Sequence, residues 1–295
     1  MRIDSHHHVW DLRTRPQPWT KDLPALQRSF GIDELRPSLA RHDIDATIAV
    51  QTVAVADETP ELLALAASDP DIAGVVGWTD LTAPDIADRL AALITPELVA
   101  IRHLAQDEPD PYWLTRREVQ AGIAAAGAAG LAYDLLVTPT QLPAAIETVR
   151  NHQDVRFVLD HGAKPLIRDF VLEPWARHIT VLAASPNVAV KLSGLVTEAP
   201  AHPTMDDLRP YCERLLSAFG PDRVMFGSDW PVCLLACDYD RVIELAESAC
   251  AGLSDAEKAS VFGETAARWY AMEAASTPPP EGGCSGRVAE DRPVP

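Results

Sequence analysis

Short apolar runs alternate with amphipathic stretches along almost the whole chain. The apolar runs predict strands near residues 2–9, 46–53, 73–79, 98–104, 131–137, 156–161, 188–194 and 224–228. Each run is followed by a stretch with helical periodicity, and a further such stretch spans residues 255–272. Most runs are continuously apolar, which is typical of parallel strands that are buried on both faces. Eight strand–helix units predict an α/β fold of the (β/α)8 TIM-barrel type, with a doubly wound open sheet as the alternative.

Composition limits the class of protein further. The chain has 295 residues, of which 47% are hydrophobic, enough for one barrel over residues 1–273. Residues 274–295 contain almost nothing to bury, and we expect a disordered tail there. The net charge of −18 argues against nucleic acid and anionic membranes as partners. No C-x-x-C pair, signal peptide or membrane span is recognisable, so we expect a cytoplasmic protein.

Polar side chains gather where the predicted strands end, which in such a barrel is the end that carries the active site. On the first strand, His6 and His8 point to the same side, because side chains alternate along a strand. Such a pair suits two nitrogen ligands of one metal ion or two donors to one substrate. A solvated strand end or the remnant of a cloning tag would have the same pattern. The other strand ends carry Gln51, Trp78, Asp80, Arg102, His103, Gln106, Asp134, Asp160, His161, Lys191, Ser193 and Asp229.

Six motifs occur in the same order as in a known family. They are Asp4-Ser-His-His-His-Val-Trp10, Ile101-Arg-His103, the segment 133–143, Leu159-Asp-His-Gly-Ala-Lys-Pro165, Lys191-Leu-Ser-Gly194 and Phe226-Gly-Ser-Asp-Trp-Pro231. Through them, residues 2–272 resemble the amidohydrolase-related (amidohydrolase 2) family of metal-dependent hydrolases. Within it, they resemble the sugar-lactone branch of L-fuconolactone and L-rhamnonolactone hydrolases. The resemblance implies a TIM barrel that opens the ester of a sugar-derived 1,4- or 1,5-lactone, in carbohydrate metabolism.

The resemblance also implies a metal site. It assigns a metal-binding or substrate-holding role to four residues, His6, His8, His161 and Asp229. Three histidines and one carboxylate can hold one divalent ion, with Zn²⁺ as the expected cofactor. A second metal is not expected, since the strand ends that hold it in binuclear relatives carry Arg102-His103 and Asp134-Leu135 here. Related lactonases work with and without a metal, so metal-free catalysis stays open.

Ester cleavage requires a base for water, a donor at the carbonyl oxygen and an acid for the leaving alkoxide. We predict Asp229 as the general base, with His161 and Arg102 as the other catalytic residues. Structural roles are the alternatives: a helix cap for Asp229, a core histidine for His161 and an ion pair for Arg102. Arg102 and His103 face opposite sides of one strand, so one of the two is expected to be structural. Lys191 is either a buried ion-pair partner or a site residue.

Residues that suit a sugar are planar polar groups and aromatic faces near the strand ends. The predicted substrate-binding residues are Gln51, Trp78, His103, Gln106, Lys164 and Trp230. The long segments 11–31 and 197–204 are predicted to be lids over the barrel mouth. The expected partner is a small sugar lactone, and a homo-oligomer is left open.

Two other functions fit the same barrel. One is hydrolysis of a carboxylated, muconolactone-type lactone or decarboxylation of an aromatic acid. A carboxylated substrate calls for several cations at the mouth, and this chain has only four lysines. The other is a barrel that binds a sugar acid without turnover, which would require a broken set of ligands and base. The expected ligands and base, which are His6, His8, His161 and Asp229, are all present.

Overall fold

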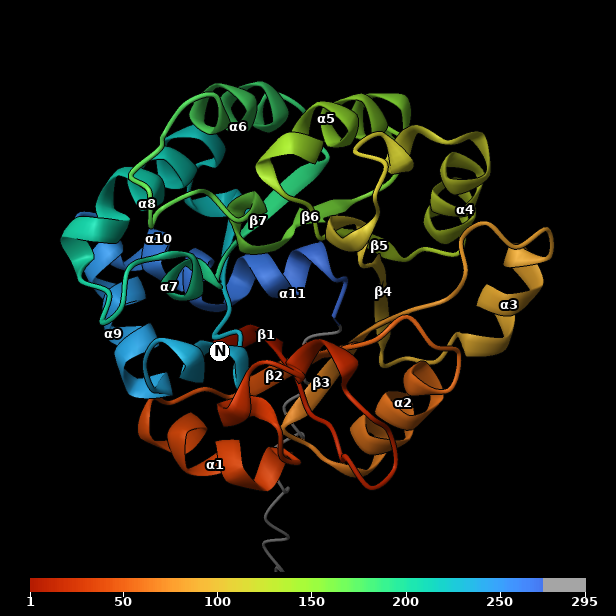
Figure 1. Cartoon of the computed structure of the whole chain (residues 1–295), viewed down its shortest axis with the longest axis horizontal. Helices are drawn as coiled ribbons and strands as arrows, with labels where there is room; N and C mark the ends of the chain where they lie inside the picture. Colours follow the sequence, from red (N-terminus) through yellow and green to blue (C-terminus); the bar gives the residue numbers. More distant parts are fainter. Residues whose placement is uncertain (273–295) are drawn as a thin grey trace, which may run out of the picture.

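The computed structural model describes residues 1–272, and these contain one ring of eight strands (Figure 1). The strands are β1 (Ile3–His7), β2 (Ala46–Val50), β3 (Ile72–Gly77), β4 (Leu98–His103), β5 (Ala132–Leu135), β6 (Phe157–Leu159), β7 (Val188–Leu192) and β8 (Val224–Phe226). Neighbours pair in parallel in the order of the chain. The tail predicted over residues 274–295 lies outside the described part.

The ring closes between the first strand and the segment that follows the last. The backbone N–H of His8 donates to the Trp230 carbonyl at 2.7 Å, and that of Asp229 donates to the His6 carbonyl at 2.8 Å. A parallel bridge joins His7 to Trp230. The predicted (β/α)8 barrel is therefore confirmed, and the doubly wound alternative was wrong.

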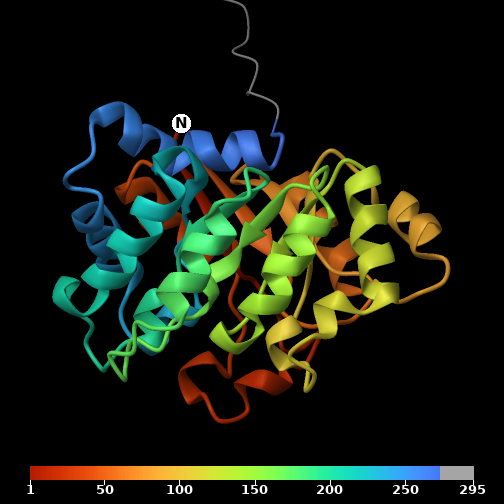
Figure 2. The same cartoon turned by 90° about the horizontal axis from the view of Figure 1, so that it is seen from above.

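The helices surround the strands, as Figure 1 shows. They are α1 (Ile32–Arg41), α2 (Glu58–Ser68), α3 (Ile86–Leu93), α4 (Arg117–Ala128), α5 (Leu142–Asn151), α6 (Trp175–Ala183), α7 (Leu195–Glu198), α8 (Met205–Phe219), α9 (Tyr239–Ala249), α10 (Asp255–Ala259) and α11 (Thr265–Trp269). Figure 2 shows α11 at one end of the barrel and the segment after β1, in red, at the other. No helix within residues 1–272 combines the length and apolar character that a membrane crossing requires.

Most strands are largely apolar because both of their faces are covered. One buried cluster fills the barrel interior and includes Ile3, Ile48, Val76, Val158 and Met225. The alternate residues pack against the helices in a second, larger cluster. This arrangement is the physical reason why the runs lack the alternation of a half-exposed sheet.

A bulge in β1 changes which residues share a face. The register of β1 against β2 shifts between Asp4 and His7. His6 and His8 do lie on one side, as predicted, and their Nε2 atoms are 3.2 Å apart. Asp4 does not join them, because its carboxylate accepts hydrogen bonds from the Ser228 backbone and the Tyr239 hydroxyl. Strict alternation along the strand would place Asp4 beside His6 and His8; that expectation was wrong, and the shift in register is the cause.

His7, which lies between His6 and His8, should make the protein less stable in acid. Burial lowers the pKa of His7 from 6.5 to about 3. Below pH 6.5 the unfolded chain binds a proton at this residue that the native protein does not bind. The free energy of unfolding should therefore fall with decreasing pH, by about 1.4 kcal/mol per pH unit for this residue. We expect His7→Gln to reduce the slope by that amount in urea unfolding of the metal-free protein.

The exposed His202 supplies the control for this experiment. His202→Asn should keep the slope of the wild type. If His7→Gln also keeps that slope, burial of His7 does not contribute to acid sensitivity.

Candidate active site

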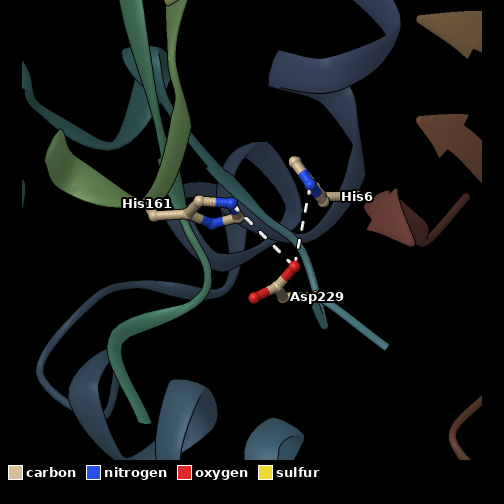
Figure 3. A group of neighbouring side chains, drawn as sticks. All are labelled: His6, His161 and Asp229. Carbon is tan, nitrogen blue, oxygen red and sulfur yellow. Dashed lines mark ion pairs between the residues drawn. The ribbon is translucent and has the colours of Figure 1, made fainter. Parts of the chain in front are cut away.

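Four predicted residues converge at the carboxyl ends of the strands. The Oδ1 atom of Asp229 lies 3.7 Å from His6 Nε2, 3.5 Å from His8 Nε2 and 3.9 Å from His161 Nε2. Figure 3 shows the His6 and His161 rings directed toward one oxygen of the Asp229 carboxylate. These residues come from β1 and the residue that follows it, the turn after β6 and the turn after β8, which barrel closure brings together.

The donor atoms fit a single ion. One ligand atom each from His6, His161 and Asp229 lies within 4.8 Å of the others. Ligands that share an ion at about 2 Å lie roughly 3–4 Å apart, which matches these contacts and the adjacent His8 Nε2. The Nδ1 atom of His8 lies 2.7 Å from the Val50 carbonyl, which only accepts hydrogen bonds. In its neutral form His8 therefore presents the lone pair of Nε2 to the site.

A buried ionic network lies behind His6. Lys191 Nζ is 2.6 Å from Asp134 Oδ2, 2.9 Å from Asp160 Oδ1 and 3.1 Å from His6 Nδ1. Asp160 also pairs with Arg102 at 3.0 Å and lies 3.4 Å from His6 Nδ1. A carboxylate beside the second nitrogen of a histidine is a common way to orient a metal ligand. Lys191 is thus both a buried ion-pair partner and a neighbour of the site.

The centre of the site has one negative charge, on Asp229, because the charges of the buried network balance one another. Two cations, Lys191 and Arg102, balance the two carboxylates of the network. Burial raises the pKa of Asp134 to about 6, whereas Lys191, His6 and Arg102 outweigh burial and hold that of Asp160 well below its usual value. Burial lowers the pKa of His6, and it lowers that of His161 to about 4, so both are neutral at pH 7. Asp229 and the imidazole lone pairs therefore suit a bound cation.

Two glycines make room for the histidines. A Cβ atom at Gly194 would lie 2.5 Å from His161 Nδ1, and one at Gly227 would lie 2.8 Å from His6 Cβ. Gly194 also has a φ of 63°, which favours glycine. The preceding Ser193 places its Oγ 2.8 Å from His161 Nδ1 and so orients the ring. The Leu-Ser-Gly and Gly-Ser-Asp motifs therefore shape the site.

A cavity of about 310 Å³ opens above these residues. It is lined by His8, Pro18, Trp19, Thr52, Val53, Ala54, Arg102, Leu104, Gln106, Asp107, Leu136, His161, Lys164, Asp229 and Val232. Of the predicted substrate-binding residues, Gln106 and Lys164 line the cavity, as does the predicted catalytic residue Arg102.

The other predicted substrate-binding residues do not line this cavity. His103 stacks on Trp113 with ring centroids 4.0 Å apart, and its Nε2 lies 2.9 Å from Glu108. Trp78 donates from Nε1 to the other nitrogen of His103. These contacts lie on the face of β4 opposite Arg102, so for His103 and Trp78 the structure favours a packing role.

Gln51 and Trp230 are buried rather than open to the cavity. The Gln51 amide donates to the Arg102 carbonyl at 3.2 Å, and the Arg102 guanidinium donates to the Gln51 carbonyl. The ring of Trp230 packs edge-on against Phe30. Gln51 therefore fixes Arg102, and Trp230 packs against the segment after β1; the substrate contacts predicted for both stay predictions.

The predicted lids differ in what they cover. Pro18 and Trp19 of the segment 11–31 line the cavity. The segment 197–204 includes the end of α7 and lines a separate surface groove with Leu235 and Ala236. Only the first segment thus contributes side chains to the cavity over Asp229.

Glu198 is a site neighbour that sequence reasoning missed. Its Oε1 lies 4.0 Å from Lys164 Nζ. Burial raises its pKa despite the nearby Lys164. Glu198 lies in the segment 197–204 predicted as a lid but belongs to no motif quoted above, so the sequence did not single out its side chain.

Known proteins share the sequence of this chain over most of its length. A family model described as amidohydrolase matches residues 3–272. L-fucono-1,5-lactonase from Burkholderia multivorans is 42% identical over 285 residues, covering 92% of this chain and 96% of the relative. The corresponding protein from Burkholderia ambifaria is 38% identical over 278 residues, with the same coverage of 92% and 96%.

A solved structure shares both the fold and the sequence. The crystal structure of an amidohydrolase from Burkholderia multivorans with bound zinc has a TM-score of 0.88 and 42% identity, over 92% of this chain and 99% of that one. The family match spans all eight strands and the residues that converge at Asp229. The predicted resemblance is confirmed: this chain belongs to the amidohydrolase family.

Proposed function

We propose that this protein hydrolyses a sugar-derived lactone to the open-chain acid, with L-fucono-1,5-lactone as the first substrate to test. The relatives from Burkholderia carry that activity in their names and cover nearly all of this chain. The observation that supports the chemistry most directly is the position of Asp229. All three of its histidine contacts go to Oδ1, and the residue lines the cavity.

Asp229 acts as the general base in this proposal. Its Oδ1 faces the histidines, which leaves Oδ2 available to a water molecule in the cavity. Burial raises the pKa of Asp229, but His161 and His8 outweigh it, so the pKa stays below its usual value and the group is a carboxylate at pH 7. It accepts the proton of the attacking water and returns it to the leaving alkoxide.

Arg102 stabilises the oxyanion in this proposal. Its Nη1 lies 3.5 Å from His6 Nε2, at the floor of the cavity. Asp160 and the Gln51 carbonyl hold the guanidinium in place, so little reorganisation is needed as charge develops. One such donor typically contributes about 10²–10³ in rate.

A divalent cation fits the donor set of this chain. His6, His161 and Asp229 would hold it, with His8 adjacent, and zinc is the ion we propose because the related crystal structure contains it. When bound, such an ion supplies Lewis-acid polarisation of the carbonyl or of water. Without metal, Arg102 would serve as a donor to the oxyanion, as would a site histidine that carries its proton on Nε2; His8, which presents a lone pair there, would not.

A carboxylated substrate receives less support. Among the residues that line the cavity, the cations are Arg102 and Lys164. Arg102 already pairs with Asp160. A carboxylate on the substrate would therefore meet mainly Lys164, so a neutral lactone is the better match.

An aldonolactone panel with and without chelator tests the proposal. We expect hydrolysis of L-fucono-1,5-lactone, followed as proton release, and about one zinc per chain by elemental analysis. A chelator should remove the metal and lower kcat by at least about tenfold, and added Zn²⁺ should restore it. Activity that survives complete metal removal would contradict a metal-dependent hydrolysis. Absence of turnover of every aldonolactone would contradict the function.

A further inference from the structure

Four successive residues after β6 have a left-handed backbone. The φ values are 53° at His161, 55° at Gly162, 62° at Ala163 and 50° at Lys164. This conformation is unfavourable for every residue except glycine, and three of the four have side chains. Such strain persists where the surrounding structure holds it, and it gathers at functional sites.

Several contacts hold this turn in place. The Lys164 backbone N–H donates to the His161 carbonyl at 2.9 Å, and the buried Trp175 indole donates to the Gly162 carbonyl at 2.7 Å. A Cβ atom at Gly162 would lie 2.9 Å from Leu215, so the turn is also packed closely from outside. His161 and Lys164 are therefore kept at a fixed spacing, one at the reaction centre and one farther along the cavity.

The two cations of the cavity lie at different depths. Arg102 is 2% exposed and contacts His6. The Lys164 side chain is 28% exposed, and its carboxylate neighbour within 4.0 Å is Glu198, not Asp229. The Lys164 ammonium is thus more exposed than the Arg102 guanidinium, which lies beside the site histidines.

We propose that Lys164 binds ring hydroxyls of the substrate and that Glu198 positions its ammonium, so that the pair selects polyhydroxylated lactones. This inference rests on the function proposed above. A lactone whose carbonyl lies at Asp229 and Arg102 directs its ring substituents toward the opening, where Lys164 lies. An ammonium supplies three donors, which suit hydroxyl oxygens, and the Glu198 carboxylate at 4.0 Å orients that ammonium.

The test compares a sugar lactone with an unsubstituted one. We expect Lys164→Met to lower kcat/KM for L-fucono-1,5-lactone by about 10–100-fold, mainly through KM, because a hydrogen bond to a charged group is lost. For δ-valerolactone, which has no hydroxyl groups, the change should stay below about threefold. Lys164→Arg should recover part of the affinity, and Glu198→Gln should raise KM for the sugar lactone alone. Lys21→Met, at an exposed lysine outside the cavity, should behave as wild type.

Each outcome decides for or against this role. An equal loss on both lactones in Lys164→Met would place the ammonium at the carbonyl and overturn the inference, as would no loss on the sugar lactone. If the wild type hydrolyses δ-valerolactone too slowly to measure, the sugar lactone decides alone. A higher KM at constant kcat supports the inference, and a lower kcat at constant KM overturns it. A wild type that hydrolyses neither lactone overturns the proposed function and, with it, this role of Lys164.

Discussion

Asp229→Asn should lower kcat on the best lactone by about 10²–10⁴, the usual contribution of a positioned base. The asparagine keeps the shape of the side chain and one oxygen toward the three histidines, but it cannot accept a proton from water. The fold should be unchanged, because the Asp229 backbone N–H still donates to the His6 carbonyl. Steady-state kinetics, with circular dichroism and metal analysis of the same preparations, measure this effect.

Two further variants distinguish a general base from a metal ligand and from a carboxylate outside the cavity. His161→Asn should lower metal content and kcat together. Asp80→Asn removes a carboxylate that also follows a strand but accepts hydrogen bonds from Thr82, outside the cavity, and should keep the kcat of the wild type. If Asp229→Asn keeps more than a tenth of kcat, another residue is the base, and His161 is the next candidate.

Lys191→Met should destabilise the protein by about 3–5 kcal/mol, the range for removing one partner of a buried ion pair. Its side chain and those of Asp134 and Asp160 are completely buried. Without the Lys191 ammonium, Arg102 is the remaining cation of the network for the carboxylates of Asp134 and Asp160. Asp134 then keeps only the hydrogen bond from the Tyr270 hydroxyl, at 2.8 Å. Urea unfolding of the metal-free protein gives the change in free energy.

The matched control removes one charge of each sign. Lys191→Met combined with Asp134→Asn leaves the pair of Asp160 and Arg102 balanced, so most of the lost stability should return. Equal destabilisation of the single and double variants would mean that lost packing, rather than an unpaired charge, is responsible.

The sequence predicted the barrel well because its evidence was local and repeated. Continuous apolar runs specify buried parallel strands, and β2 and β7 appear where the runs do. The convergence of His6, His161 and Asp229 followed from the rule that parallel strands bring their carboxyl ends to one face.

What the sequence did not predict depends on side-chain direction and on distant partners. Arg102 and His103 are adjacent, and only the barrel shows that the first faces the cavity whereas the second stacks on Trp113. The bulge that separates Asp4 from His6 has no local sequence signal. The ion pairs of Lys191 join residues from β5 and the end of β6, which no periodicity in one segment can reveal.

Closure of the ring between β1 and the segment after β8 has a consequence for the order of synthesis. His6 is made with β1, whereas Asp229 follows only after seven further strands have been made. A nascent chain that stops before β8 carries the histidine pair without the carboxylate, so it lacks the complete set of donors. With the metal site proposed above, ion uptake would therefore report whether the first and last strands have met. Zinc affinity during translation or refolding would then be a measure of complete barrel closure.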